Sequence, residues 1–189
     1  MEPDKIRKKL RALLDKERFD HSISVEITAL ELAKIHGVDP YKTAVAGLLH
    51  DCAKNTSPDN ILKAALKEKI KMDLFLKKEP KLVHGLLSAS IARKDFGISD
   101  PDILAAISNH TSGRPGMSDL EKIIFLADHL EPGREGSGRA RMFSVAKKDL
   151  DKAIVMVADD MIKYLIKRGF PIHSRAILTR NYYIKKTNA

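Results

Sequence analysis

The sequence predicts an all-α fold, and three observations on the 189-residue chain support this prediction. Hydrophobic residues recur three and four positions apart along most of the chain, as they do on one face of a helix. Pairs such as Asp39-Pro40 and Asp100-Pro101 precede several of these segments, and an aspartate cap followed by proline favours the first turn of a helix. No segment alternates like a β-strand, and no two hydrophobic segments flank a tight Asn-Gly or Asp-Gly turn.

In the first part of the chain, four segments combine helical spacing with signals for a helix start or end. The first has hydrophobic residues four and three positions apart from Ile6 onward. The second ends before Gly37, because glycine readily adopts the left-handed conformation at a helix C-terminus. Asp39 opens the third segment and Ser57 opens the fourth, each followed directly by proline. We expect helices over residues 6–14, 22–36, 39–50 and 57–70.

Five further segments show the same signals in the rest of the chain. The first of them stops at Gly97, and Asp100 caps the next one. Ser118 caps the third, Gly169 ends the fourth and longest, and Ser174 starts the last. We expect helices over residues 84–96, 100–110, 118–130, 148–168 and 174–183.

The chain contains no internal repeat, low-complexity tract or linker long enough to divide it, so we expect one domain over residues 1–189. The least regular segment covers residues 131–142 and contains three glycines and three arginines. Because surface loops often carry binding residues, we expect this segment to be a loop that folds over a ligand.

Composition and charge narrow the classes of function. The formal net charge of +9 fits either an anionic partner or simple solubility, and we favour solubility. Aromatic residues are scarce, at 5%, which argues against a platform that stacks nucleic-acid bases. No hydrophobic run approaches the roughly 20 residues that span a bilayer, and the N-terminal residues lack a signal-peptide core. With Cys52 as the single cysteine, no internal disulfide can form, so we expect a cytoplasmic protein without a membrane partner.

Histidine and aspartate side chains at the ends of hydrophobic helical segments are candidate metal ligands. His50 and Asp51 directly follow the hydrophobic residues 44–49. Adjacent helical residues point about 100° apart, so this pair needs ligands from other helices to complete a site. The full candidate set is His21, His50, Asp51, His84, His110 and Asp128. Imidazole and carboxylate donors suit iron, manganese or cobalt better than an ion that prefers thiolates.

Each of these residues also has an ordinary structural explanation. Asp128 follows a hydrophobic run, where a charge is costly unless it is paired or bound to a metal, so a buried ion pair is the alternative to a site. His36 stands at a predicted helix C-terminus, where a cation complements the helix dipole. We expect His129 to be structural as well, and Cys52 to pack beside the site rather than to bind metal. His173 fits either role.

Several polar residues near these ligands are candidates for binding phosphate. Lys54 lies three residues after Asp51 and could either balance its charge or hold a phosphate oxygen. The polar turn that begins at Thr111 could offer hydroxyl and N–H groups to a phosphate, or be an ordinary turn. Three arginines could grip a phosphate with paired hydrogen bonds or lie on the surface: Arg18, Arg114 and Arg134.

The order of the candidate ligands resembles a known superfamily. The chain has a histidine, then His50-Asp51, then a distant aspartate, an order that is similar to the HD superfamily of metal-dependent phosphohydrolases. Two further histidines between Asp51 and the last aspartate resemble the members of this superfamily that have an extended site. Segments 17–22, 47–54, 110–115, 122–134 and 168–173 further resemble the bacterial YqeK family of symmetrical bis(5'-nucleosyl)-tetraphosphatases. The most specific of these stretches runs from Ala127 to Arg134.

This resemblance implies an HD-domain helical bundle that hydrolyses symmetrical dinucleoside tetraphosphates, such as diadenosine tetraphosphate, to two ADP by a metal-activated water. It implies one or two metal ions, with iron favoured over manganese, cobalt or magnesium. One ion would be bound by His21, His50, Asp51 and Asp128, and His84 and His110 would hold a second ion or face the phosphates. The implied catalytic residues are Asp51, Lys54, His84 and His110. The implied substrate-binding residues are Arg18, His84, His110, Thr111, Asp128, Arg134, Ile172, His173 and Ile177.

Two other functions compete with this one. The same metal site could act on another nucleotide, or a helical scaffold with a charge of +9 could bind nucleotides or RNA without catalysis. The complete ligand set and the few aromatic residues favour the enzyme, and a homodimer is compatible with the sequence. The family pattern has an aromatic-Pro-Gly stretch soon after Arg134, whereas this chain has Glu135-Gly136-Ser137-Gly138, so we expect the loop and the substrate specificity to differ.

Overall fold

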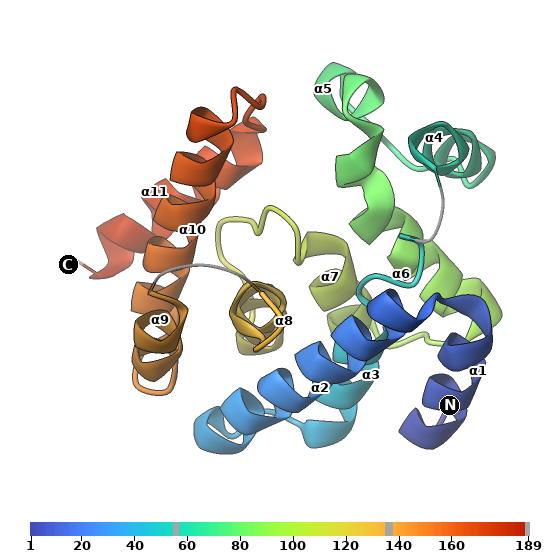
Figure 1. Ribbon diagram of the computed structural model, residues 1–189, viewed down its shortest axis with the longest axis horizontal. Coiled ribbons are helices and arrows are strands. Elements are labelled where there is room, and N and C mark those ends of the chain that lie inside the picture. Colours follow the sequence, from blue (N-terminus) through green and yellow to red (C-terminus); the bar gives the residue numbers. More distant parts are fainter. Residues whose placement is uncertain (55–56, 135–137, 188–189) are drawn as a thin grey trace.

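The computed structural model describes residues 1–54, 57–134 and 138–187, and it confirms the all-α prediction (Figure 1). None of the described residues belongs to a β-strand. The elements are α1 (Pro3–Leu13), α2 (Lys16–His36), α3 (Pro40–Leu49), α4 (Pro58–Lys67), α5 (Leu74–Lys78), the 3-10 helix η1 (Pro80–Val83), α6 (His84–Asp95), α7 (Pro101–Asn109), α8 (Asp119–Leu130), α9 (Arg139–Ala146), α10 (Leu150–Lys167) and α11 (Ser174–Thr187).

Helix α2 begins six residues earlier than the sequence pattern predicts. The side chain of Asp15 caps this helix by accepting a hydrogen bond from the backbone N–H of Arg18 at 2.9 Å. An aspartate cap satisfies one of the unpaired N–H groups in the first turn, so the helix extends back to Lys16. His21 therefore lies inside the helix and not at its entrance, which fixes the direction of its side chain.

Three other expectations are corrected by the structure. Helix α4 ends at Lys67, before Lys69 adopts a positive φ of 55°, so the expected helix to residue 70 is too long. The short elements α5 and η1 were not expected, because neither is long enough to show periodicity. The expected loop over residues 131–142 becomes helical from Arg139, where α9 begins, and residues 135–137 lie outside the described part of the chain.

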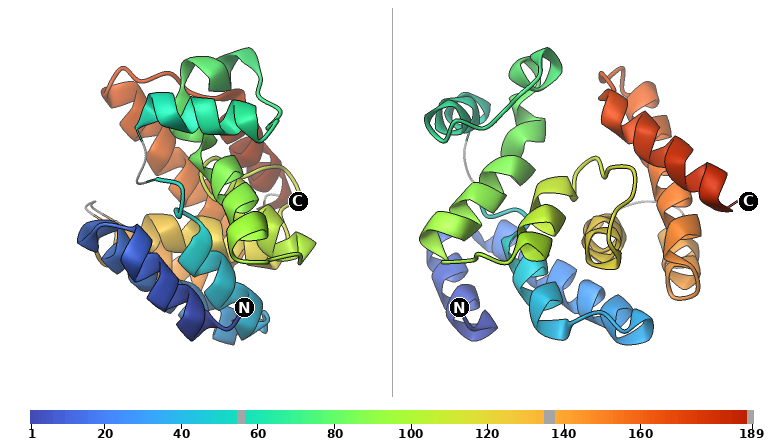
Figure 2. Two further views of the ribbon diagram at one scale, coloured as in Figure 1. Left: turned by 90° about the vertical axis from the view of Figure 1, so that its right-hand side faces the viewer. Right: turned by 180° about the vertical axis from the view of Figure 1, so that it is seen from behind.

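The helices form two outer groups around a central one. Helices α2, α3, α7 and α8 pack against one another in the middle of the molecule. Helix α10 packs along α8, α9 and α11 on one side, while α4, α5 and η1 lie on the other side next to α6 (Figures 1 and 2). The central helices are thus flanked on both sides by other helices.

Helix α8 is the most deeply buried element. Its residues from Ile123 to Ala127 expose no surface, so this helix is hydrophobic on all sides where it crosses the core. A helix of this kind belongs in the interior of a protein. Asp128, the next residue, is only 5% exposed, so the fold carries a carboxylate into the interior.

Two helix crossings are close because a glycine stands at each of them. A Cβ atom on Gly47 of α3 would lie 3.0 Å from the Cα of Glu26 in α2. A Cβ atom on Gly85 of α6 would lie 3.1 Å from the carbonyl oxygen of Ser108 in α7 and 3.3 Å from the ring of His110. Both crossings adjoin candidate metal ligands.

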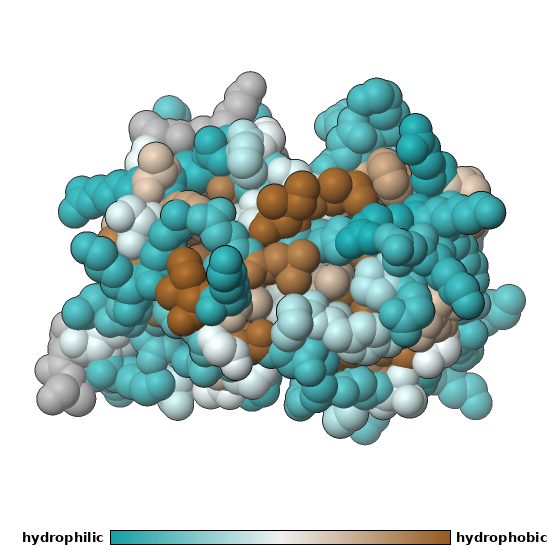
Figure 3. Space-filling model, turned by 90° about the horizontal axis from the view of Figure 1, so that it is seen from below, coloured by the Kyte–Doolittle hydropathy of each residue, from teal (hydrophilic) through white to brown (hydrophobic). Residues whose placement is uncertain are grey.

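The surface is mainly hydrophilic. On the face shown in Figure 3, hydrophilic side chains surround a hydrophobic area near the middle. Among the helices of the described residues, none is both long enough and hydrophobic enough to cross a membrane.

Candidate metal centre

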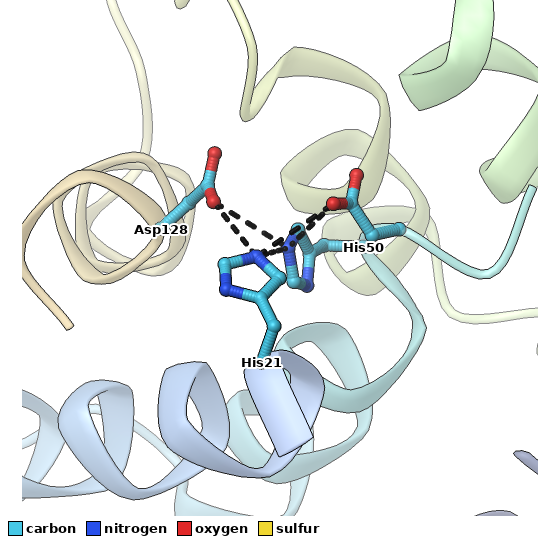
Figure 4. Close-up of side chains that lie close together, drawn as sticks. His21, His50 and Asp128 are labelled. Carbon is cyan, nitrogen blue, oxygen red and sulfur yellow. Dashed lines mark hydrogen bonds and ion pairs between the residues drawn. The ribbon is translucent and has the colours of Figure 1, made fainter. Parts of the chain in front are cut away.

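The six candidate ligands converge from five helical segments on one point inside the molecule. His21 projects from within α2 toward His50, and Asp128 faces both from α8 (Figure 4). His50 and His110 directly follow the last residues of α3 and α7, and His84 is the first residue of α6. Helix ends and one buried helix thus bring together residues that are up to 107 positions apart in the sequence (128 − 21).

Four of these residues form what we call the first donor group: His21, His50, Asp51 and Asp128. The Nε2 atom of His21 lies 3.2 Å from Nε2 of His50 and 3.1 Å from Oδ1 of Asp128. Oδ2 of Asp51 lies 3.5 Å from Nε2 of His50 and 3.6 Å from Nε2 of His21. Two nitrogens and two carboxylate oxygens therefore face a common centre.

The second donor group consists of Asp51, His84 and His110. Oδ1 of Asp51, its other oxygen, lies 3.2 Å from Nε2 of His84 and 3.4 Å from Nε2 of His110. These two nitrogens are 3.0 Å apart, and the hydroxyl of Thr111 lies 3.1 Å from the first and 3.2 Å from the second. Asp51 therefore connects the two groups, with one oxygen facing each.

Hydrogen bonds on the outer side of the rings fix which nitrogen carries the proton. The Nδ1 atoms of three rings donate to carbonyl oxygens three residues earlier, at 2.5 to 2.8 Å: His50 to Gly47, His84 to Lys81 and His110 to Ile107. Nδ1 of His21 donates to Oε1 of Glu131 at 3.2 Å. Because a carbonyl or carboxylate only accepts, each Nδ1 holds a proton, and in its neutral form each ring presents the lone pair of Nε2 to the centre.

This arrangement fits a divalent metal ion. Two unprotonated nitrogens about 3 Å apart repel each other unless a cation lies between them. Oδ1 of Asp51 is buried, and within the described residues it accepts no hydrogen bond, which is costly for a charged oxygen. A mixed set of imidazole and carboxylate donors suits iron, manganese, cobalt or zinc, and donated Nδ1 protons are typical of metal-binding histidines.

The ionisation states also favour metal binding. Burial alone raises the pKa of Asp51, but positive charge on the adjoining His50, His110 and His84 rings holds it well below the usual range, and a bound cation supplies that charge when the rings are neutral. Burial likewise opposes ionisation of Asp128, yet positive charge at His21, His50 and Arg134 keeps its pKa well below normal, and a bound cation would act in the same way. Burial lowers the pKa of His84, so its ring is neutral at pH 7. Neutral imidazoles and ionised carboxylates are the forms that bind metals.

Two basic side chains lie directly against the carboxylates. Nζ of Lys54 contacts Oδ2 of Asp51 at 2.8 Å. The guanidinium of Arg134 donates to a carboxylate oxygen of Asp128, and its Nε donates to the backbone carbonyl of Asp128 at 2.9 Å. Burial alone lowers the pKa of Arg134, but Asp128 raises it above its ordinary value, so this side chain stays charged beside the centre.

Two cavities lie on either side of Arg134, next to this centre. The charged cavity has a volume of about 510 Å³ and is lined by His21, Arg18, Lys54 and Arg134 among others. The hydrophobic cavity has a volume of about 360 Å³ and lies between Thr111, Tyr164 and His173. Since Arg134 lines both cavities, it stands at the boundary between them.

Some of the remaining predicted binding residues line these cavities, and others do not. Thr111 and His173 line the hydrophobic cavity, and Arg18 lines the charged one. Ile172 and Ile177 line neither of the two, and Ile177 is 38% exposed.

Arg114 does not reach the centre as a phosphate clamp would. Its guanidinium makes two hydrogen bonds to the buried carboxylate of Glu121, at 2.7 and 2.6 Å. The N–H of Ser118 orients the same carboxylate at 2.8 Å, because Ser118 and Glu121 form a capping box at the start of α8. Arg114 therefore stabilises a helix start.

Three residues expected to be structural have partners consistent with that role. Ring nitrogen Nε2 of His36 donates to the carbonyl of Ala146 at 2.8 Å, which ties α2 to α9. Nδ1 of His129 donates to the carbonyl of Phe125 at 2.8 Å, although its ring also lines the hydrophobic cavity. Cys52 belongs to neither donor group, and burial raises the pKa of its thiol to about 12.

Glu131 is a residue of the site to which sequence reasoning gave no role. Its carboxylate is 3% exposed and accepts three hydrogen bonds, from Nδ1 of His21, from the hydroxyl of Ser24 at 2.7 Å and from the N–H of Gly133 at 2.5 Å. A carboxylate behind a metal-binding histidine orients the ring and raises its basicity. The sequence feature that could have indicated this role is the position of Glu131, one helical turn after Asp128 and immediately past the end of α8.

Comparisons with known proteins identify the family of this chain. A family model described as the HD domain matches residues 18–133. Symmetrical bis(5'-nucleosyl)-tetraphosphatases of Halalkalibacterium halodurans and Bacillus subtilis are 39% and 35% identical to the chain; the first match covers 89% of each chain, and the second 90% of this chain and 91% of the relative. A crystal structure from Clostridium acetobutylicum, described as a predicted HD superfamily hydrolase involved in NAD metabolism, matches with a TM-score of 0.93 and 42% identity over 97% of each chain.

The helical fold and its buried centre of histidine and aspartate side chains define an HD-domain protein. Within that class, the chain belongs to the family of symmetrical bis(5'-nucleosyl)-tetraphosphatases.

Proposed function

We propose that this protein hydrolyses symmetrical dinucleoside tetraphosphates, with diadenosine tetraphosphate giving two ADP. The observation that carries the proposal is the pair of donor groups connected by Asp51, in a chain whose relatives have that name. In the reaction, water adds across the central phosphoanhydride. One phosphorus gains the oxygen of water, the bridging oxygen leaves with the other phosphorus, and both protons of the water are released when the two new terminal phosphates ionise.

We propose iron as the resident metal, with manganese, cobalt or magnesium as substitutes. His21, His50, Asp51 and Asp128 would hold one ion, and His84 and His110 would hold a second ion or face the phosphates. A bound ion supplies a Lewis acid that lowers the pKa of water and neutralises charge on the phosphate oxygens.

The basic residues are suited to binding the phosphates. Lys54 has three N–H donors and uses one on Asp51, so two remain for phosphate oxygens. Arg134 uses Nε and one terminal nitrogen on Asp128, which leaves the second terminal nitrogen available. Both side chains would draw the central phosphates toward the carboxylates that hold the metal, and Thr111 would add a hydroxyl donor.

The hydrophobic cavity is suited to one nucleoside of the substrate. Its lining combines Tyr164, Leu165 and Pro171 with the polar side chains of Thr111 and His173, a mixture typical of small-molecule sites. We propose that the base packs against the hydrophobic part and that the diphosphate extends toward Arg134. Ile172 and Ile177 would then support the turn and the helix that carry His173, rather than contact the base.

The wider setting is also a proposal. We propose one domain over residues 1–189 that acts in the cytoplasm on a nucleotide substrate, without a membrane or nucleic-acid partner. A homodimer is compatible with it, and light scattering of the purified protein measures this state.

Product analysis tests the proposed reaction directly. Purified protein supplied with Fe²⁺ or Mn²⁺ should convert diadenosine tetraphosphate to ADP alone, and formation of ATP with AMP would contradict it. Asp51→Asn should reduce kcat/KM by at least about 100-fold, because a charged ligand shared by both groups is lost. Asp102→Asn, at an exposed aspartate paired with Lys42, is the matched control and should retain wild-type activity.

A further inference from the structure

The charged cavity differs from the hydrophobic cavity in the chemistry of its lining. Of the nine described residues that line it, seven have ionisable side chains, and the other two are Ser24 and Gly133. The imidazole of His21 is the one ring among these nine, and its Nε2 faces the metal donors, so they offer no hydrophobic side chain to cover a nucleoside base. A cavity of this kind suits a charged and hydroxylated ligand better than a flat hydrophobic one.

Among the described basic residues of this cavity, Arg18 has a guanidinium without an ion pair. Within the part of the chain that the structure describes, Lys54 and Arg134 are paired with Asp51 and Asp128, whereas the guanidinium of Arg18 makes no ion pair or side-chain hydrogen bond. Arg18 is only partly exposed, one turn of α2 before His21. Its charge is thus held beside the metal centre without an internal partner.

The acidic residues of the cavity do not neutralise Arg18. Asp20 forms an ion pair with Lys16, on the outer side of α2. Glu131 accepts its hydrogen bonds from His21, Ser24 and Gly133. The exposed carboxylate of Glu17 remains, and a carboxylate of this kind can accept hydrogen bonds from ribose hydroxyls.

The proposed reaction requires space on both sides of the bond that is broken. Central cleavage leaves one nucleoside diphosphate on each side of the metal centre. If one half occupies the hydrophobic cavity, the other half extends past Arg134 on the opposite side. The charged cavity begins there, with His21 in its wall.

We propose that the charged cavity binds the second nucleoside diphosphate half of the substrate, with Arg18 holding its phosphates. This inference rests on the proposed function. The base of this half would lie in solvent, since the described residues of the lining offer no hydrophobic side chain to pack against it. The two identical halves of the substrate are thus bound by unlike sites, one selective for the base and one for the diphosphate.

Steady-state kinetics test the role of Arg18. Arg18→Ala should raise KM for diadenosine tetraphosphate about 10- to 100-fold, the range expected for a charge-assisted hydrogen bond to phosphate, and change kcat little. Arg18→Glu should raise KM further, and Arg18→Lys should restore part of the loss. Arg141→Ala removes an exposed arginine on α9 that lines neither cavity and should behave as wild type.

Equilibrium binding of ADP provides a readout that does not depend on turnover. Wild-type protein loaded with metal should bind two ADP per chain, one more tightly than the other. Arg18→Glu should abolish the weaker site and leave the tighter one within about twofold of wild type. A single ADP site in the wild type, equal weakening of both sites, or an unchanged KM in Arg18→Ala would overturn the inference. A wild-type protein that does not cleave diadenosine tetraphosphate would instead overturn the proposed function, whatever the number of ADP sites.

Discussion

Replacement of Glu131 by glutamine tests whether the residue behind His21 controls the metal centre. In the wild type, the two carboxylate oxygens accept three hydrogen bonds, from His21, Ser24 and Gly133. Glutamine has nearly the same shape but only one accepting oxygen, and its NH₂ group is a donor. One orientation of the amide keeps the hydrogen bond from His21 and places the NH₂ group against the N–H of Gly133. The other orientation keeps the bonds from Ser24 and Gly133 and places the NH₂ group against Nδ1–H of His21, so that this ring loses its fixed tautomer and direction.

The expected loss is confined to one of the four ligands in the first donor group. Partners behind a metal-binding histidine are typically worth about 10- to 100-fold in metal affinity. This range corresponds to about 1.4 to 2.8 kcal/mol of binding free energy. The rings of His50, His84 and His110 are held by backbone carbonyls and should be unaffected. The metal should therefore bind more weakly to Glu131→Gln, but it should still bind.

Competition with a coloured chelator measures this affinity without any substrate. Ser24→Ala is the matched control, because it removes one hydrogen bond from the same carboxylate and leaves the bond to His21. We expect the control to bind metal within about threefold of the wild type, which is about 0.6 kcal/mol. A dissociation constant for Glu131→Gln within the same range as that of Ser24→Ala would refute the reasoning. Denaturant unfolding of both variants without metal separates loss of affinity from loss of folding.

Three further predictions concern the metal, acid stability and the thiol. Removal of the metal by a chelator should abolish turnover. Mn²⁺ added back at 100 times its dissociation constant should raise the free energy of unfolding by about 2.7 kcal/mol, because it binds the folded state. An unchanged urea midpoint would contradict a metal site in the folded protein. Burial alone raises the pKa of Glu121, but Arg114 and the N–H of Ser118 hold it below the ordinary value. The stabilisation that these contacts give is complete above the ordinary carboxyl pKa and is lost as the pH falls through the lowered pKa of Glu121. Glu121→Gln should therefore reduce the free energy of unfolding in urea by about 1.5 to 3 kcal/mol at pH 7 and weaken its dependence on pH on the acid side. An unaltered dependence of the unfolding free energy on pH would count against this pairing. Because partial burial raises the pKa of Cys52 to about 12, iodoacetamide should label it at pH 8 much more slowly before unfolding than after, and equal rates would contradict the raised pKa.

The sequence was sufficient to predict the helical class and the set of donor residues. Hydrophobic spacing and capping residues mark long helices such as α8 and α10, and their expected bounds agree with the structure to within about two residues. His50 and His110 stand at the ends of hydrophobic segments, so the same pattern that predicts each helix also predicts where its polar end lies. The donors are brought together because these ends meet in the core.

Other features depend on contacts that no local pattern contains. The pairing of Glu131 with His21 joins residues 110 positions apart, and it arises only because α8 lies against α2. The orientation of Glu121 toward Arg114 could have been predicted from the sequence, because Ser118 and Glu121 have the spacing of a capping box, which fixes the position of the carboxylate. The short helices α5 and η1 left no periodic signal, because fewer than two turns cannot define a face.

The two glycines at the helix crossings determine where metal preference can vary. Each histidine pair is carried by two helices whose backbones approach closely. This approach occurs at Gly47 with Glu26 for one pair and at Gly85 with Ser108 for the other. Leucines elsewhere in the core can be exchanged, at a cost in stability, while these spacings stay the same. A single methyl group at either glycine would instead move a whole helix together with the ligand it carries. We therefore expect substitutions at these two positions, which provide no ligand atom, to alter the metal preference of the centre while every histidine is kept.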